Sequence, residues 1–254
     1  MLVLTEGEKE MRIRINLITP LAFWGSKRQH PLMLDGVLSY VALYRMGYRK
    51  SPAEHLSEAL VTPYLPIKKE RTPDGEFYRA SAMFTPKEAY WTQTMIYRFA
   101  DWGIEAAKTF KKPFGRTNEE QSGPYRQCQE PYFLLVTPYV DFYCDCEDEK
   151  ELFSLLSDLR SLGFLGSKRA AGYGMIASIR INRDEPGEWG VWKDGKPTRP
   201  VPVSWAGEGL NHPIDYCRIM PPYWHSQGRV LCYVPYPEQW SAAGDPVREL
   251  GIAE

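Results

Sequence analysis

This sequence of 254 residues has few cysteines, no long apolar run and almost no net charge. The 5 cysteines are irregularly spaced, which excludes a disulfide framework and favours a reducing compartment. No apolar run approaches the roughly 18 residues that a membrane span requires, and the acidic start has no apolar core of the secretory kind. The hydrophobic fraction of 43% excludes a disordered chain. We therefore expect a folded, cytoplasmic protein with no membrane contact.

The charge balance excludes a protein that coats nucleic acid through bulk positive charge. Its formal net charge is −1, from 31 Lys and Arg against 32 Asp and Glu. The charges are unevenly placed, because residues 11–182 carry 23 Lys and Arg against 19 Asp and Glu, a net of +4. A local basic cluster is either a solvated face or a contact for an anionic partner. The clusters are formed by Lys27, Arg28, Lys68, Lys69, Arg71, Lys108, Lys111, Lys112, Arg116, Lys168 and Arg169.

Hydrophobic periodicity predicts a strand and then a helix near the start of the chain. Residues 11–17 alternate between apolar and polar side chains, which indicates a half-buried strand that Pro20 ends. Residues 34–47 have helical spacing of apolar side chains. We expect Asp35 to cap this helix and Gly47 to close it.

The second half of the chain repeats this arrangement in another order. Residues 131–146 are aromatic and β-branched, which predicts a strand bent at Pro138. Residues 147–163 predict a helix with acidic residues at its start and a glycine at its end, and residues 175–182 predict a further strand.

These elements predict an α+β fold of the ferredoxin-like (RRM-like) type, with the order βαββαβ. The strand still missing from this order is supplied by residues 76–84 or 60–68. The expected divisions of the chain are a peripheral segment at 1–10, the ferredoxin-like domain at 11–182, an aromatic and basic inserted arm within it at about 85–130, and a β-rich C-terminal extension at 183–254 packed on the same domain.

The strongest functional signal is the loop Gly166–Gly174, "GSKRAAGYG". Its glycines allow positive φ and close approach of backbone N–H groups to a ligand, while Lys168 and Arg169 supply charge for phosphate. The loop follows a helix and precedes a strand, whereas Walker and dinucleotide-binding loops follow a strand and open a helix. The residues by themselves are compatible with a plain turn and with a phosphate-binding loop.

Two motifs carry a resemblance to a known family. "LGFLGSKRAAGYG" resembles the glycine-rich loop of the CRISPR-associated RAMP superfamily, and "TPLAFWGSKRQHPLMLDGVLSYVAL" resembles backbone and capping subunits of type IV CRISPR effector complexes. The resemblance covers residues 11–182 and is greatest to the subunit that caps the five-prime handle of the guide RNA. It implies a non-enzymatic protein whose partners are the crRNA handle, other effector subunits and the flanking motif of target DNA.

The same resemblance implies where RNA is bound. The glycine loop is expected to grip the handle phosphates, the basic pair before the first helix to extend that surface, and the arm to separate handle from spacer. Exposed aromatic residues of these regions are candidates for base stacking, although such residues are also common in cores. The RNA-binding candidates are Lys27, Arg28, His30, Lys108, Lys111, Lys112, Arg116, Arg126, Gly166, Ser167, Lys168, Arg169, Gly172, Tyr173 and Gly174, and the further stacking candidates are Tyr90, Trp91, Tyr97, Phe110, Phe114 and Tyr125.

Two alternatives stay open. In the first, the protein is a metal-independent guide-processing endoribonuclease of the same superfamily, and His30 acts as its general acid or base. In the second, the basic clusters are only solvated faces, and the protein is a scaffold that contacts other proteins but no nucleic acid.

The cysteines and histidines do not favour a metal site. Cys144 and Cys146 have the wrong spacing for a zinc knuckle and no second pair nearby. The remaining candidates are widely separated in the sequence, so that a zinc site formed by them is the less favoured interpretation. They are His212, Cys217, His225 and Cys232. We expect no metal, no cofactor and no catalytic residue.

Overall fold

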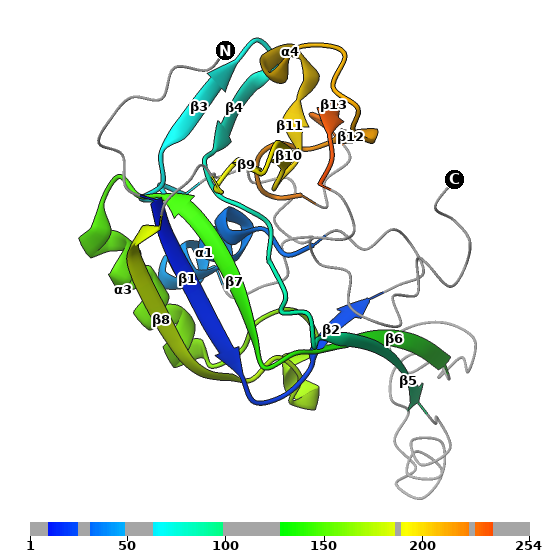
Figure 1. Ribbon diagram of the computed structural model, residues 1–254. Helices are drawn as coiled ribbons and strands as arrows, with labels where there is room; N and C mark the ends of the chain where they lie inside the picture. Colours follow the sequence, from blue (N-terminus) through cyan, green and yellow to red (C-terminus); the bar gives the residue numbers. More distant parts are fainter. Residues whose placement is uncertain are drawn as a thin grey trace, which may run out of the picture.

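A three-stranded antiparallel sheet lies at the centre of the molecule (Figure 1). The structure is a computed structural model that describes residues 10–24, 31–48, 63–98, 128–185, 189–223 and 227–235. In the sheet, β1 (Glu10–Leu17) lies between β7 (Tyr139–Asp145) and β8 (Ile176–Glu185). Ile13 and Ile15 are fully buried, so the alternation places the apolar side chains of β1 toward the core and confirms the first predicted strand.

Two helices cover one face of this sheet (Figure 1). They are α1 (Leu34–Arg45) and α3 (Glu149–Leu162), and both were predicted from helical spacing. The side chain of Asp148 caps α3 by accepting from the N–H of Glu151, and Gly163 ends the helix at φ 80°. Four leucines of α3 are buried, each contributing about 1.5–3 kcal/mol to folding. Among the described residues, no helix has the length and apolar character needed to cross a bilayer.

The chain between the two helices runs beside β7 without forming a regular strand there. The predicted strand at 76–84 is realised only over β4 (Gly75–Tyr78), which pairs with β3 (Lys69–Thr72) in a hairpin. Farther along, Ala80 and Phe84 form isolated antiparallel bridges to β7. The pairing is interrupted because Ala82 donates instead to the carbonyl of Thr198 (2.9 Å).

A second antiparallel sheet has the order β2-β6-β5. It contains β2 (Leu21–Trp24), β5 (Tyr90–Arg98) and β6 (Cys128–Val136). The prediction of one bent strand over 131–146 is wrong, because Pro138 separates β6 from β7 and the two belong to different sheets. The short strand β2 was not predicted. β5 and β6 pair along their whole lengths and flank the middle of the expected arm, which lies outside the described residues.

The C-terminal part is rich in short strands. A hairpin joins β9 (Trp192–Lys193) to β10 (Lys196–Pro197). A further sheet has the order β11-β13-β12, and the one-turn helix α4 follows β11. Its strands and helix are β11 (Val201–Pro202), α4 (Val203–Ala206), β12 (Ile214–Cys217) and β13 (Val230–Tyr233). Phe77 of β4 packs into the apolar cluster of this region, and Met220 packs against both this cluster and the main core.

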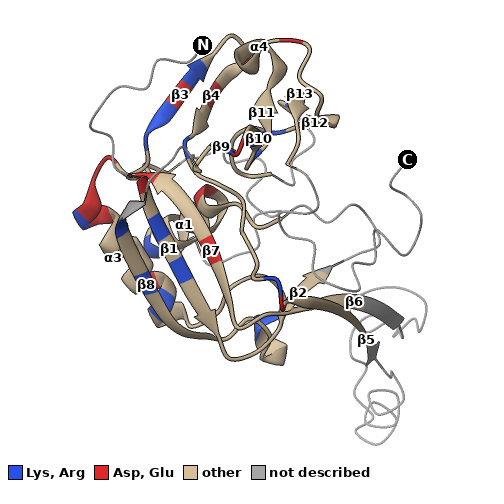
Figure 2. Ribbon diagram, viewed as in Figure 1, with Lys and Arg blue, Asp and Glu red and all other residues tan. Residues whose placement is uncertain are grey.

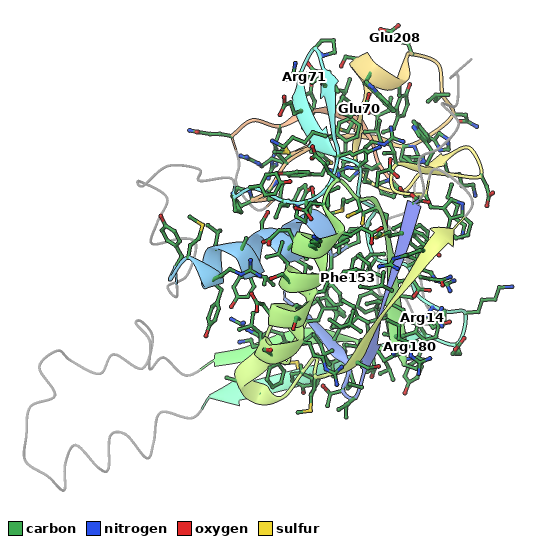
Figure 3. All side chains as sticks on the ribbon, turned by 90° about the vertical axis from the view of Figure 1, so that its left-hand side faces the viewer. Arg14, Glu70, Arg71, Phe153, Arg180 and Glu208 are labelled. Atoms are coloured by element: carbon green, nitrogen blue, oxygen red, sulfur yellow. The ribbon has the colours of Figure 1, made fainter. Side chains whose placement is uncertain are left out.

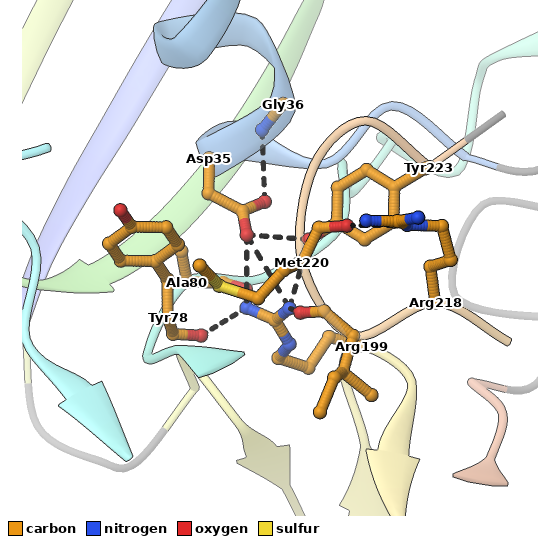
Figure 4. A network of polar contacts seen from close by, with 9 residues as sticks. Asp35, Gly36, Tyr78, Ala80, Arg199, Arg218, Met220 and Tyr223 are labelled. Carbon is orange, nitrogen blue, oxygen red and sulfur yellow. Dashed lines mark hydrogen bonds and ion pairs between the residues drawn. The ribbon is translucent and has the colours of Figure 1, made fainter. Parts of the chain in front are cut away.

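A buried network holds α1 to the C-terminal part (Figure 4). Asp35 and Arg199 are both fully buried, with Arg199 Nη2 3.4 Å from Asp35 Oδ2. Tyr223 donates to Asp35 Oδ2 (2.5 Å), while Arg199 donates to Tyr223 Oη (2.9 Å) and to the carbonyls of Ile219 (2.7 Å) and Ala80 (3.1 Å). Burial raises the pKa of Asp35, and the adjacent guanidinium opposes that rise.

The prediction that Asp35 caps α1 is therefore wrong. The cap position is held by Met33, which makes no side-chain cap hydrogen bond. Asp35 lies within the first turn, where its Oδ1 accepts only from the N–H of Gly36 (3.0 Å). In the sequence, an acidic residue near the start of a helix is compatible with a helix cap and with a buried ion pair. The position of Arg199 in the fold decides for the ion pair.

β1 begins at Glu10, one residue before the predicted boundary, and this carboxyl is 1% exposed. It accepts from the backbone N–H groups of Trp189 (2.8 Å) and Gly190. Burial raises the pKa of Glu10 from 4.5 to about 8, although these two donors and Arg79 act to lower it.

Glu10 should therefore make stability depend on pH. Because its pKa is raised in the folded state, its stabilising contribution is complete below the unfolded pKa of 4.5 and is lost as the pH rises through about 8. We expect the stability of the wild type to fall over this range relative to that of Glu10→Gln, which cannot titrate. Urea unfolding of both proteins at several pH values measures the difference, and a difference that stays constant with pH contradicts the assignment.

Candidate nucleic-acid interface

The glycine loop joins the end of α3 to the start of β8. Its base is closed by an antiparallel bridge between Phe164 and Met175 and by the N–H of Leu165, which donates to the carbonyl of Gly174 (2.8 Å). The two ends of the loop are therefore held side by side, and the loop is anchored on α3 and β8.

Four residues of the loop have positive φ. They are Gly166 (80°), Lys168 (56°), Gly172 (82°) and Gly174 (71°). Lys168 is the unusual one, because a side chain in the left-handed region costs about 1–2 kcal/mol. Between Lys168 and Gly172 the chain forms one 3₁₀ turn, Arg169–Ala171, which brings the two basic residues to the tip.

The loop is docked on the connection between β1 and β2. Gly174 N–H donates to the carbonyl of Pro20 (2.8 Å), and Thr19 Oγ1 donates to the carbonyl of Gly172 (2.8 Å). Ser167 forms a bridge to Ala22, and its hydroxyl donates to the Ala22 carbonyl (2.5 Å). These contacts keep the backbone of the loop in one position.

This docking changes the predicted roles of three residues. The N–H of Gly172 donates to the carbonyl of Arg169 (2.8 Å), and the donors of Gly174 and Ser167 are also used inside the protein. These groups were expected to grip phosphate. Since their hydrogen atoms are engaged, the capacity of the loop for an anion comes from the side chains at its tip.

Both basic side chains of the tip lie against tyrosine rings. Lys168 Nζ is 4.4 Å from the ring centroid of Tyr132 in β6, and Arg169 Cζ is 4.8 Å from that of Tyr40 in α1. Arg169 also donates to Tyr40 Oη. A cation held over a ring keeps its position while its remaining N–H groups can still bind an anion.

The sequence did not single out either tyrosine. Tyr40 stands four residues before Tyr44, and the two rings pack at 6.4 Å, so helical spacing was the available signal. Tyr132 is 1% exposed within an apolar strand, and nothing in the sequence distinguishes it from a core residue.

One cluster of acidic residues lies far from the tip. The cluster Glu147–Glu151 stands at the N-terminus of α3, and the loop follows its C-terminus. The 14 residues of α3 span about 21 Å at 1.5 Å per residue. Figure 2 shows these acids gathered at one end of α3. The charge of this cluster is therefore largely screened from Lys168 and Arg169.

Several predicted RNA-binding residues lie outside the described residues. These are Lys27, Arg28, His30, Lys108, Lys111, Lys112, Arg116 and Arg126. The first three follow directly on β2, whose last residue, Trp24, pairs with the same Tyr132 that Lys168 contacts.

The aromatic candidates divide into three groups. Tyr90 is 47% exposed at the start of β5, and Tyr173 is half-buried in the glycine loop. Trp91 is 7% exposed and packs edge-on against Phe23 at 5.2 Å, so it belongs to the core. The side chain of Tyr97 and the residues Phe110, Phe114 and Tyr125 lie outside the described part of the chain.

The described residues contain no group of three or more His, Cys, Asp or Glu side chains able to hold a metal ion. Burial raises the pKa of the Cys144 thiol well above its usual value and that of Cys146 to about 11, so both thiols stay protonated. A protonated thiol is a poor metal ligand.

A comparison with protein families assigns this chain to the class of CRISPR type IV associated proteins. The model of the CRISPR type IV associated protein Csf3 matches residues 9–235, which is most of the chain. The chain therefore belongs to the Csf3 family. This confirms the resemblance to type IV CRISPR proteins.

Comparison with solved structures finds a similar chain in the cryo-EM structure of the type III-B Cmr-beta complex bound to cognate target RNA. The identity is 9% and the TM-score is 0.37, with 70% of this chain aligned. The match spans 62% of the length of that neighbour. Comparison with curated proteins finds no match.

Proposed function

We propose that this protein is a non-catalytic, guide-RNA-binding subunit of a type IV CRISPR ribonucleoprotein complex. It holds the five-prime handle of the crRNA and caps one end of the assembly. The observation that carries the proposal is the glycine loop, which presents Lys168 and Arg169 together at a fixed tip.

The arrangement of the central elements supports a ferredoxin-like core. β1 leads to α1 through the short strand β2 of the second sheet, the segment 79–84 bridges β7 in antiparallel fashion, and α3 leads from β7 to β8. With the bridging segment at the edge, the order across the sheet is β8, β1, β7 and 79–84. This order supports a βαββαβ assignment in which the second strand is irregular.

The two cations of the tip suit a sugar-phosphate backbone. Lys168 acts as a compact charge, whereas the planar guanidinium of Arg169 can hold a phosphate through two N–H groups. We propose that Lys27, Arg28 and His30 extend this surface, because they follow β2 closely in the sequence and Trp24, the last residue of β2, pairs with Tyr132. The basic arm separates handle from spacer and contacts other subunits, and the capping position allows the protein to help read the flanking motif of target DNA.

Replacing Lys168 and Arg169 together by Ala should weaken binding of handle RNA and flatten its salt dependence. Each phosphate released lowers the slope of log K against log salt by about 0.7 for a single strand, so the pair accounts for about 1.4. Fluorescence anisotropy over a salt series measures both affinity and slope.

The matched control is Lys69→Ala with Arg71→Ala. It removes the same charge from the exposed hairpin β3–β4, where both side chains pair with Glu76. Equal affinity and parallel slopes for the loop variant and the wild type mean that the loop is only a turn. Incubation of the protein with repeat RNA and a chelator tests the proposal that it is not an enzyme. A discrete cut in the RNA that is lost in His30→Ala would show that the protein is a guide-processing nuclease.

A further inference from the structure

The central sheet has a second face, on the side away from α1 and α3. In Figure 1 both helices lie on one side of β8, β1 and β7, and in Figure 3 Arg14 and Arg180 point away from the helix that carries Phe153. We call this surface the outer sheet face. It is defined by Arg12, Arg14, Asn16, Tyr139, Asp141, Tyr143, Ser178, Arg180 and Asn182.

Strand register places these side chains in three rows across the sheet. Asn16 lies between Tyr139 and Ser178, and its Nδ2 donates to Ser178 Oγ (2.8 Å). Two residues earlier in β1, the next row places Arg14 between Asp141 and Arg180. Successive rows stand about 6.8 Å apart, since a strand rises about 3.4 Å per residue.

The middle row contains a fixed, planar cation. Arg14 donates through Nε and Nη2 to the two carboxylate oxygens of Asp141, each at 2.8 Å, and its guanidinium stacks on the ring of Tyr139 at 3.7 Å. This pairing raises the pKa of Arg14 above its usual value. With 30% of its side chain exposed, Arg14 offers a flat cationic surface whose orientation is set by its neighbours.

The chemistry of the outer sheet face suits nucleic acid better than protein. The single carboxylate in its two best-defined rows, Asp141, is held by Arg14, while Arg180 is exposed. Among the described residues, none of the exposed large apolar side chains lies in β1, β7 or β8. Protein interfaces have apolar, charge-depleted centres, whereas nucleic-acid interfaces are polar and positive.

We propose that the outer sheet face binds a single-stranded nucleic acid, as a second contact separate from the glycine loop. Unpaired bases stack on Arg14 and Tyr139, Arg180 contacts phosphate, and the amide of Asn16 is placed to meet base edges. The two surfaces are distinct because Arg169 of the loop contacts α1, which lies on the opposite side of the sheet.

Arg180→Ala tests this assignment. The probes are fluorescein-labelled 20-mers of uridine and of thymidine, which represent guide RNA and displaced DNA as the two sources of a single strand. We expect about a three- to tenfold loss of affinity and a salt slope shallower by about 0.7. The probe that binds the wild type more tightly identifies the source.

Arg183→Ala is the matched control. Arg183 lies on the same strand but on the helix side, where it pairs with Glu149 at 2.9 Å and lies over Phe153. Its loss should leave affinity unchanged. Arg14→Lys should weaken binding without changing the slope, because it keeps the charge and removes the planar stack.

Equal affinities of the Arg180→Ala and Arg183→Ala variants would overturn the proposal. Normal probe binding by Arg180→Ala together with loss of partner subunits in co-purification would also overturn it, since the face would then be a protein interface. Handle binding by the Lys168 and Arg169 double variant is measured separately, so failure of the loop assignment is distinguishable from failure of this one.

Discussion

Arg199→Met is expected to lower the free energy of unfolding by about 3–5 kcal/mol, because it leaves Asp35 buried without its cation. The guanidinium also satisfies the carbonyls of Tyr78, Ala80 and Ile219, and Met cannot donate to them. Removing one member of a buried pair leaves a desolvated charge, which costs more than the pair itself contributes.

The double variant Asp35→Asn with Arg199→Met separates charge from packing. It removes the unpaired carboxylate, so its loss of stability should be smaller than the sum of the two single losses. Arg218→Met is the control, since Arg218 lies in the same region but is only partly buried and donates to the carbonyls of Met220 and Gln227. Chemical denaturation gives the values, and a loss below about 1 kcal/mol for Arg199→Met contradicts the assigned role.

Gly174→Ala should be the second strongly destabilising change, at about 3 kcal/mol or more. A Cβ at this position would lie 1.9 Å from the carbonyl oxygen of Leu165, and the backbones of Gly174 and Leu165 are both held by hydrogen bonds. Residues 165 and 174, at the base of the glycine loop, would have to move apart to accommodate a methyl group.

Gly172→Ala is the matched control in the same loop. Its φ of 82° is similar to the 71° of Gly174, but a Cβ there meets nothing within 4 Å. Its cost is therefore limited to the conformational term of about 1–2 kcal/mol. Thermal unfolding of the two variants compares them directly, and equal losses would show that close approach at Gly174 has no energetic importance.

The parts of the fold that were predicted correctly are those with a local signal. The alternation around Ile13 and the leucine spacing of α3 arise because each element buries one side against the core, and that side is encoded in the element itself. β6 and β7 were merged because both are apolar and aromatic, and the sequence does not show that they pair with different strands.

The candidate site was only partly predictable for the same reason. The glycines and the Lys168-Arg169 pair are adjacent in the sequence and were found. Tyr40 and Tyr132 reach the loop through tertiary structure, as do the carbonyls of Pro20 and Ala22 that occupy the donors of Gly174 and Ser167. Asp35 was misassigned because its partner Arg199 stands 164 residues away.

The docking of the glycine loop also has a kinetic meaning. A loop that is tied to Thr19, Pro20 and Ala22 has little freedom to lose when a ligand arrives, so binding requires no closing step. Under the proposed function, we expect association with the handle to be limited by diffusion and by the attraction between phosphates and the two cations of the tip, which salt weakens. For the proposed handle complex, we therefore expect the time that the RNA stays bound to depend on its contacts with the loop and not on the motion of a lid.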